Sequence, residues 1–420
     1  MYPQATAPSA PPTAQDEQRL PPSYYRIVEE TSSEYVGMDR MRVYAEQLNA
    51  LPQADRDAAR ALFAEYAEKM VERNASDLDL GGPGCNELIW YRVDGFKRPE
   101  HEMGRLSMEE ANMLLLTMLA PYQQQYLFQH YAHDFGYSLE VPGDMARRFR
   151  ASVYMDQKQL GLSMRMLPWK PRPLRSLGFH PRIEHGFMFR FVRDGLTLFT
   201  GVTGSGKSTT LDAIVDANND DFEGHILIIA QPIEYIHTSK KCIVRHREVG
   251  TDVDNFVEGM IQGLRQDPDI VVVGEMRNPE TIEAAMEMAD TGHKVFSTLH
   301  TGSAMETIDR IVAEYSPDEQ ERIRHRLADV LRCVVSQKLL PAVSGGRILA
   351  KEVLWMTSSS RAAIKNNNTH EIYQMMWEGS DEGMITLEQD LLRLLHTGDI
   401  TPDTALAYAN NKRRLLQLIR

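Results

Sequence analysis

Cysteine and long apolar runs are both scarce in this chain of 420 residues. Its three cysteines, Cys85, Cys242 and Cys333, lie far apart in the sequence, which excludes a dense disulfide framework and a CxxC zinc pattern. The longest apolar run covers only residues 113–120, whereas a membrane-spanning helix needs roughly 20 residues. No apolar signal-peptide region opens the sequence. These absences predict a cytoplasmic protein in a reducing compartment.

Positive charge is also in short supply over the whole chain, with 46 Lys and Arg against 59 Asp and Glu. The resulting formal net charge of −13 argues against a surface that binds nucleic acid. One segment departs from this balance, because residues 145–193 contain eleven Lys or Arg and only two acids, Asp156 and Glu184. Two interpretations remain open for it: a solvated basic face, or arginines that face nucleotide phosphates or an acidic neighbour.

The length and composition are those of a globular protein with two or three domains. Hydrophobic residues make up 42% and charged residues 25%, which is an ordinary balance for a chain with a large core. Residues 1–22 contain six prolines and few large apolar side chains, so we expect them to be disordered or polyproline-like. We assign a Pro-rich leader to residues 1–25, an N-terminal extension and domain to residues 26–177, and a second domain to residues 178–420.

The first half of the chain predicts a small α/β domain that ends at the proline-rich segment 168–173. Amphipathic spacing indicates helices, and short alternating runs broken by glycines indicate strands. The expected helices cover residues 41–51, 55–71, 107–120 and 122–133. The expected strands cover residues 76–80, 88–93 and 137–141, followed by a hairpin of residues 149–155 and 162–167.

From residue 178 onward, short apolar runs alternate with helix-compatible segments. This alternation predicts a largely parallel sheet flanked by helices, with ligands bound at the carboxyl ends of the strands. The expected strands cover residues 196–200, 225–230, 270–273 and 294–299. The expected helices cover residues 208–217, 254–265, 279–290 and 303–313, and we expect helices to dominate again over residues 317–340.

A glycine-rich loop at residues 201–208 carries the strongest functional signal. Its sequence, GVTGSGKS, fits G-x-x-x-x-G-K-[ST] at every fixed position and lies between an expected strand and an expected helix. Glycines let successive backbone N–H groups wrap phosphate oxygens, and the helix N-terminus adds its dipole. Lys207 would reach the β- and γ-phosphates of ATP, and the Ser208 hydroxyl would hold Mg²⁺. The predicted nucleotide contacts are Gly201, Thr203, Gly204, Ser205, Gly206, Lys207, Ser208 and Thr209.

Two acidic residues follow expected strands of the second domain. Glu275 lies just past the strand at residues 270–273, where an acid can bind Mg²⁺ or position water. Glu234 lies beyond the strand at residues 225–230 and would act as general base if it lies within hydrogen-bond reach of the attacking water. Both acids are therefore candidates for the chemistry at the P-loop.

Two histidines bracket the expected strand at residues 294–299. Seven residues of strand separate His293 from His300 by about 23 Å, so the two cannot bind one metal ion. The polarity of the strand puts His300 at the nucleotide edge, where it would sense or neutralise the γ-phosphate. His293 is expected to form structural hydrogen bonds.

With these motifs, the chain resembles the type II/type IV secretion ATPase family. The four sequences GVTGSGKST, QPIEYIH, DPDIVVVGEMRN and TGHKVFSTLHT look like its Walker A, Asp, Walker B and His boxes. More narrowly, the chain resembles the pilus-retraction branch through SKKC at 239–242, REVG at 247–250, TIDR at 307–310 and QKLLP at 337–341, the last two in expected helices. The four-cysteine zinc element of the extension motors cannot form here, because the chain has three cysteines.

The resemblance implies the architecture. Each subunit of a homohexameric ring would join a PAS-like α/β N-terminal domain to a RecA-like P-loop ATPase domain with a largely parallel sheet and a helical C-terminal part. In such rings one subunit donates arginines to nucleotide held in or beside its neighbour, and Arg148, Arg150 and Arg165 fall on the matching strands. Under this resemblance, the negatively charged partner of the basic segment 145–193 would be the nucleotide phosphates of a neighbouring subunit.

The resemblance also implies roles at the nucleotide. Glu234 would be the catalytic base, Glu275 the Walker B acid, and His293 with His300 the pair of the His box. ATP and Mg²⁺ are the implied cofactors, with Ser208 and Glu275 as the Mg²⁺ ligands. The implied protein is peripheral, docks at the cytoplasmic face of the inner membrane on a pilus platform protein, and needs no nucleic acid.

The chain departs from the family pattern at several places: Val202 replaces a usual proline, Asn278 replaces a usual Asp, and two further departures bear on function. Ala230 and Gln231 stand where the Asp box usually begins with Glu-Asp, and the retraction signature is shortened around residues 366–368. The expected function is an ATP-hydrolysing hexameric motor for type IV pilus retraction. The departures leave two alternatives open: an assembly ATPase of a related secretion or conjugation system, or a weakly hydrolysing nucleotide-binding regulator of a partner motor.

Overall fold

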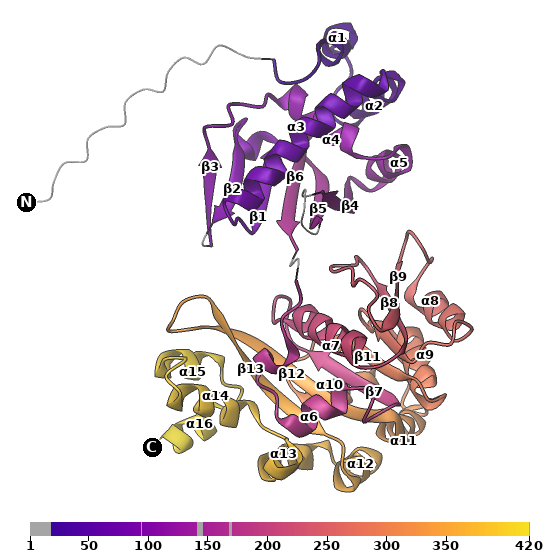
Figure 1. Ribbon diagram of the computed structural model, residues 1–420, viewed down its shortest axis with the longest axis vertical. Coiled ribbons are helices and arrows are strands. Elements are labelled where there is room, and N and C mark those ends of the chain that lie inside the picture. The colour runs from indigo at the N-terminus through magenta and orange to yellow at the C-terminus, as the bar shows by residue number, and fades with distance from the viewer. Residues whose placement is uncertain (1–17, 94, 141–145, 168–169, 420) are drawn as a thin grey trace, which may run out of the picture. The chain divides into compact units, whose positions relative to one another are not determined.

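The chain divides into two compact units, residues 1–169 and 170–420, which are described one at a time (Figure 1). The computed structural model describes residues 18–93, 95–140, 146–167 and 170–419. Most of the expected Pro-rich leader and part of the expected linker at 168–173 lie outside these residues. Among the helices that are described, none is both long and apolar enough to span a bilayer.

The first unit contains a six-stranded antiparallel sheet with strand order β3-β2-β1-β6-β5-β4. Its strands are β1 (Asp77–Gly81), β2 (Ile89–Val93), β3 (Phe96–Glu100), β4 (Ala132–Leu139), β5 (Arg147–Asp156) and β6 (Gln159–Met166). Side chains alternate between the two faces: Phe149, Ala151 and Val153 of β5 are buried, whereas Arg150 is exposed. The expected hairpin is therefore present, as β5 and β6.

Five helices share a core with the buried face of this sheet. They are α1 (Pro22–Glu30), α2 (Met38–Ala50), α3 (Gln53–Glu72), α4 (Met108–Met118) and α5 (Pro121–His130), with a short 3-10 turn, η1 (Pro83–Cys85). Tyr24, Met41 and Phe63 are buried in that core, so the N-terminal extension packs into this unit. The expectation of a disordered leader is wrong for residues 22–25, which form the first turn of α1 and bury Tyr24. Helix α4 begins with a capping box, in which Ser107 and Glu110 bind each other's backbone N–H groups.

The second unit contains a seven-stranded sheet with strand order β13-β12-β7-β11-β10-β8-β9. Its strands are β7 (Gly195–Thr200), β8 (Gly224–Ala230), β9 (Cys242–Glu248), β10 (Ile270–Val273), β11 (Lys294–Leu299), β12 (Leu331–Pro341) and β13 (Arg347–Trp355). All neighbours run parallel except β12 and β13, which are antiparallel. The sheet is thus largely parallel, as expected, and its central strands are buried on both faces.

Helices cover both faces of this sheet (Figure 1). On one face lie α6 (Pro181–Phe187) and α7 (Lys207–Asp221), preceded by η2 (Leu174–Leu177). On the other face lie α8 (Phe256–Gly263), α9 (Pro279–Asp290), α10 (Ala304–Ala313), α11 (Gln320–Val330) and α12 (Ser358–Lys365). The C-terminal part adds η3 (Thr369–Glu371), α13 (Ile372–Glu378), η4 (Ser380–Glu382), α14 (Leu387–His396), α15 (Pro402–Tyr408) and α16 (Lys412–Ile419).

The expectation of helix over residues 317–340 is wrong after Val330. Helix α11 ends there, and strand β12 begins at the next residue, so the segment 337–341 is a strand as well. An apolar run of this length suits a buried helix or a buried strand, and the deciding partners, β7 and β13, are found only in the folded chain. Strands β3, β9 and β13 were not predicted from the sequence either. Strand β4 begins at Ala132, inside the helix expected over residues 122–133.

Candidate functional site

The glycine-rich loop joins the buried strand β7 to helix α7. Gly201, Gly204 and Gly206 have φ angles of 139°, 81° and 94°, a region that other residues rarely adopt. A Cβ atom at Gly201 would collide with the carbonyl oxygen of Gln337 and the hydroxyl of Ser205. At Gly204, no described atom lies within 4 Å of such a Cβ. The loop is therefore packed against β12 at its start and open at Gly204, where a phosphate can approach the backbone.

Lys207 and Ser205 supply the polar side chains of this loop. Lys207 is only 8% exposed, and its Nζ donates a hydrogen bond to the carbonyl oxygen of Gly201 at 2.7 Å. Burial lowers the pKa of Lys207, whereas the carboxylates of Glu275 and Glu234 act in the opposite direction. The buried Ser205 hydroxyl has no hydrogen-bond partner among the described residues. A buried ammonium group, a hydroxyl without a partner and an open glycine loop fit an oligophosphate ligand.

The remaining predicted contacts belong to the same loop and helix. Thr203 and Ser208 are exposed and Thr209 is half-buried. Ser208 lies in the first turn of α7, one residue after Lys207. The described part of the chain has no group of three or more His, Cys, Asp or Glu side chains suited to a metal ion.

Glu275 and His300 face each other across the ends of β10 and β11. The Glu275 carboxylate pairs with Arg277 at 2.8 Å and lies 3.9 Å from Nε2 of His300. Burial lowers the pKa of His300, the positive charge of Lys207 lowers it further, and Glu275 opposes the shift. Lys207, Glu275 and His300 therefore lie near enough for their charges to act on one another. The cause is the parallel pairing of β7, β11 and β10, whose carboxyl ends meet at one edge.

Glu234 reaches the same neighbourhood from an irregular loop. It lies four residues beyond β8, in the segment 231–241 that connects β8 to β9. Its side chain is half-buried, and its charge acts on the pKa of Lys207. Strand β8 pairs with β10 in parallel, so the segment that follows β8 leaves the sheet at the P-loop edge. The structure therefore places Glu234 at the P-loop edge, near enough for its charge to act on Lys207.

His293 lies at the other end of β11. Its Nδ1 donates to the carbonyl oxygen of Met288 at 3.1 Å, and its own carbonyl oxygen accepts from the N–H of Gly195 at 3.0 Å. These contacts join the end of α9 to the start of β7, at the amino edge of the sheet. The structure does not bring His293 to the P-loop, which agrees with the structural role expected from the sequence. The pairing of His293 with His300 at the nucleotide, which the family resemblance implied, is not seen.

The three predicted arginines lie on the sheet of the first unit. Arg150 and Arg165 are cross-strand partners on β5 and β6, and Arg148 lies two residues before Arg150 on the same face of β5. Nε of Arg165 pairs with Asp77 at 2.7 Å, while Arg150 lies 3.5 Å from Asp134. The arginines thus form a group on one unit, whereas the P-loop belongs to the other unit.

Strand β12 supports the P-loop through two buried contacts that the sequence did not predict. The Ser336 hydroxyl lies 2.8 Å from the hydroxyl of Thr200, at the end of β7. Nε2 of Gln337, which is 1% exposed, donates to the Thr210 hydroxyl of α7 at 2.7 Å. The sequence signal for Gln337 is its place in the QKLLP segment, whereas no motif points to Ser336.

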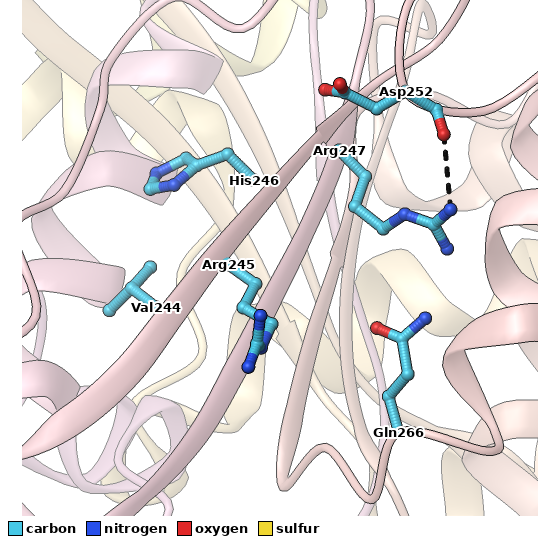
Figure 2. Close-up of a pocket in the computed structure, with 6 residues that line it drawn as sticks. All are labelled: Val244, Arg245, His246, Arg247, Asp252 and Gln266. Carbon is cyan, nitrogen blue, oxygen red and sulfur yellow. Dashed lines mark hydrogen bonds between the residues drawn. The ribbon is translucent and has the colours of Figure 1, made fainter.

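An open cavity of about 740 Å³ lies along strand β9 rather than at the P-loop (Figure 2). Its lining residues are Val244, Arg245, His246, Arg247, Asp252 and Gln266. None of them is a predicted nucleotide contact. In Figure 2 the Arg247 guanidinium donates to the backbone carbonyl oxygen of Asp252, at 3.2 Å. The candidate nucleotide site is the open loop, because a glycine-rich loop can offer backbone N–H donors to phosphate without a deep cavity.

Several known proteins are similar to this chain over most of its length. The family profile described as type II/IV secretion system protein matches residues 53–394. The type IV pilus retraction ATPase PilT of Pseudomonas aeruginosa is 39% identical over 338 residues, which cover 80% of this chain and 94% of PilT. A twitching motility protein of Neisseria gonorrhoeae is 35% identical, covering 79% of this chain and 86% of its own length.

A solved structure agrees with these sequence matches. The crystal structure of the pilus retraction motor PilT with bound ADP matches 84% of this chain and 98% of its own chain, with a TM-score of 0.77 and 34% identity. The α/β fold is therefore that of a PilT ATPase. Because the family profile spans most of the chain and the motifs converge at one sheet edge, this chain belongs to the type II/IV secretion system protein family.

Proposed function

We propose that this chain is the ATP-hydrolysing motor that powers retraction of a type IV pilus. The observation that carries the proposal is the convergence of Lys207, Glu234, Glu275 and His300 beside an open glycine loop. The similarity to the PilT retraction ATPase over 80% of the chain supports pilus retraction as the work that hydrolysis drives.

The proposed chemistry begins with the P-loop. Backbone N–H groups between Gly201 and Lys207 bind the phosphates, and Lys207 exchanges its hydrogen bond to the Gly201 carbonyl for phosphate oxygens. Glu234 accepts the proton of the water that attacks the γ-phosphate in line. His300 responds to the γ-phosphate through its contact with Glu275. Since the transition state spreads negative charge over oxygens, fixed cations at this site lower the barrier.

Mg²⁺ is the metal that fits these residues. Ser208 and Glu275 would hold it, and when bound it supplies a positive charge that neutralises the phosphate oxygens. One carboxylate oxygen of Glu275 pairs with Arg277 at 2.8 Å, whereas the other lies 3.9 Å from Nε2 of His300, beyond hydrogen-bond distance, and would be the one that meets the metal. Arg277 keeps that carboxylate in place at the end of β10.

The proposed assembly is a homohexamer of subunits with a PAS-like first domain and a RecA-like second domain. The bounds expected from the sequence, residues 26–177 and 178–420, lie close to the division between residues 169 and 170 in the folded chain. Arg148, Arg150 and Arg165 of one subunit would contact nucleotide held in or beside its neighbour, and their grouping on one sheet face supports this role. Head-to-tail contacts close such a ring. The ring would dock on an inner-membrane pilus platform protein at its cytoplasmic face, with no requirement for nucleic acid.

The test of this function uses two variants of the purified full-length protein, Lys207→Ala and Glu234→Gln. The first removes the phosphate-binding ammonium group and should abolish nucleotide binding and turnover. The second keeps the shape of the side chain but removes the base, so ATP should still bind while hydrolysis falls by about 100-fold or more. Full ATPase activity in both variants would contradict the mechanism.

A deletion of the gene tests the direction of work. Loss of a retraction motor should leave cells with excess surface pili and no twitching movement. Loss of pili would instead indicate an assembly motor. Very slow ATP turnover with intact ATP binding would indicate a regulator of a partner ATPase, the alternative to which the altered residues Ala230 and Gln231 point.

A further inference from the structure

The segment that carries Glu234 has no regular secondary structure. Residues 231–241 connect β8 to β9 as an irregular loop, so only individual contacts hold it in place. Two buried residues flank Glu234 within it: Ile233, which is 6% exposed, and His237, which is 3% exposed. Whatever holds His237 therefore limits the positions that Glu234 can reach, three residues away.

His237 is held between helix α7 and strand β9. Its Nε2 donates a hydrogen bond to Oδ1 of Asp212 on α7, at 3.2 Å. Its backbone N–H donates to Nε2 of His246 on β9, at 3.0 Å. The rings of His237 and His246 are nearly parallel, with centroids 6.1 Å apart, and Tyr235 contacts His237 edge-on at 4.6 Å. These contacts attach the loop to helix α7 on one side and to strand β9 on the other.

The rest of the loop also follows α7. Nδ2 of Asn219 donates to the carbonyl oxygen of Thr238 at 2.8 Å, and the backbone N–H of Lys240 donates to the Asn219 side chain at 3.0 Å. Nζ of Lys240 lies 2.8 Å from Asp216 and 2.9 Å from Asp220, both exposed or half-buried on the same helix. Helix α7 begins with Lys207, so the element that presents the ammonium group also holds the loop of Glu234.

We propose that Asp212 is a positioning residue for hydrolysis, which acts through buried His237 to hold Glu234 at the site of Lys207. This inference rests on the proposed role of Glu234 as the base. Several side-chain contacts link α7 to this loop, and the one made by Asp212 reaches the loop at His237, three residues from Glu234. The contacts of Asn219 and Asp216 reach it farther from Glu234, at Thr238 and Lys240. A base that shifts by about 1 Å loses up to roughly 100-fold in rate, although substrate still binds.

The test compares Asp212→Ala with Asp212→Asn in the full-length protein. Asp212→Ala removes the acceptor of the His237 hydrogen bond, so we expect kcat for ATP hydrolysis to fall by about 10- to 100-fold while KM stays within about twofold. Asp212→Asn keeps an acceptor oxygen at the same position and should restore most of the rate. Asp220→Asn is the matched control, because it changes another carboxylate of α7 that contacts the loop only at exposed Lys240.

A second comparison separates positioning from mere support of the fold. In a Glu234→Gln background, Asp212→Ala should cause no further loss of kcat, because the base through which Asp212 acts is already absent. The proposal would be overturned if Asp212→Ala lowered kcat by the same factor in the Glu234→Gln background as in the parent protein. It would also be overturned if Asp212→Ala raised KM and left kcat unchanged. Should Asp212→Ala unfold, His237→Gln in the same two backgrounds gives the answer. Normal activity of Glu234→Gln alone would instead contradict the proposed base, and thus the proposed function.

Discussion

Lys207 lies buried between a loop carbonyl and the field of two carboxylates, Glu234 and Glu275. Burial lowers the pKa of this ammonium group, and the two acids oppose that shift because each favours the charged form. The same acids would repel phosphate oxygens. Glu275 is relieved of this conflict in part by Arg277, which pairs with it at 2.8 Å, and by a metal cation in the proposed mechanism.

At Glu275, we predict that removal of one charge separates binding from turnover. Glu275→Gln keeps the size of the side chain but weakens its contacts with Arg277 and with a metal ion. ATP affinity should change by less than about 10-fold, while hydrolysis should fall by about 100-fold, since the charge matters most in the transition state. Equilibrium binding and steady-state ATPase assays check this. Glu319→Gln, an exposed partner of Arg322, is the control, and equal activity of both variants would contradict the prediction.

Glu352 gives a second prediction at the residue scale, which concerns pH. Burial raises its pKa from the ordinary 4.5 to about 7, against the hydrogen bond that its Oε1 accepts from the N–H of Ala304 at 2.7 Å. Between these two pH values the folded chain holds a proton that the unfolded chain releases. The contribution of Glu352 to stability is therefore full below pH 4.5 and falls as pH rises toward 7, by about 1.4 kcal/mol per pH unit.

Glu352→Gln should remove this dependence, because an amide does not titrate but still accepts the bond from Ala304. The midpoint of thermal unfolding of the variant should drop less than that of the parent protein between pH 5 and pH 7. Above pH 8 the unfolding midpoints of the two proteins should change with pH in parallel, because the Glu352 side chain of the parent is then fully ionised. Identical pH profiles over the whole range would show that Glu352 titrates normally.

At the scale of elements, strand β12 holds the P-loop from the side opposite to β11. Gln337→Ala should lower the free energy of unfolding of the second unit by about 1 to 3 kcal/mol, since it leaves the buried Thr210 hydroxyl without a donor. ATP affinity should fall as well, because Thr210 lies in the first turns of α7. Urea unfolding and nucleotide titration measure the two effects. Gln417→Ala, at an exposed position of α16, should change neither.

At the scale of the whole molecule, the arginines and the P-loop lie on separate units. If the arginines act on nucleotide of a neighbouring subunit, Lys207→Ala and Arg150→Ala proteins should each be inactive alone and should regain ATPase activity when mixed. In mixed rings, some interfaces combine an intact Lys207 with an intact Arg150. Light scattering should find hexamers in both proteins and in the mixture. No recovery in hexamers that have exchanged subunits would place the arginines in the same subunit as the nucleotide.

Local patterns predicted the elements around the P-loop well. The expected segments 270–273, 279–290 and 294–299 coincide with β10, α9 and β11. Helix α9 was predictable because Asn278 caps it and Pro279 occupies its first turn, a signal contained in a few neighbouring residues. Strand β12 was not, because its apolar run acquires strand geometry from β7 and β13, which are distant in sequence.

The residue types that form the site can be predicted from the amino-acid sequence, because a phosphate loop needs glycine, lysine and hydroxyl residues at set spacings within one short segment. That His300 and not His293 lies at the loop edge can be predicted in the same way, since strand polarity decides this. The residues that support those groups become known from the folded chain, because they come from distant segments. Gln337 reaches α7 from β12, and Asp212 reaches the loop of Glu234 through His237, and both contacts join segments that no local pattern connects.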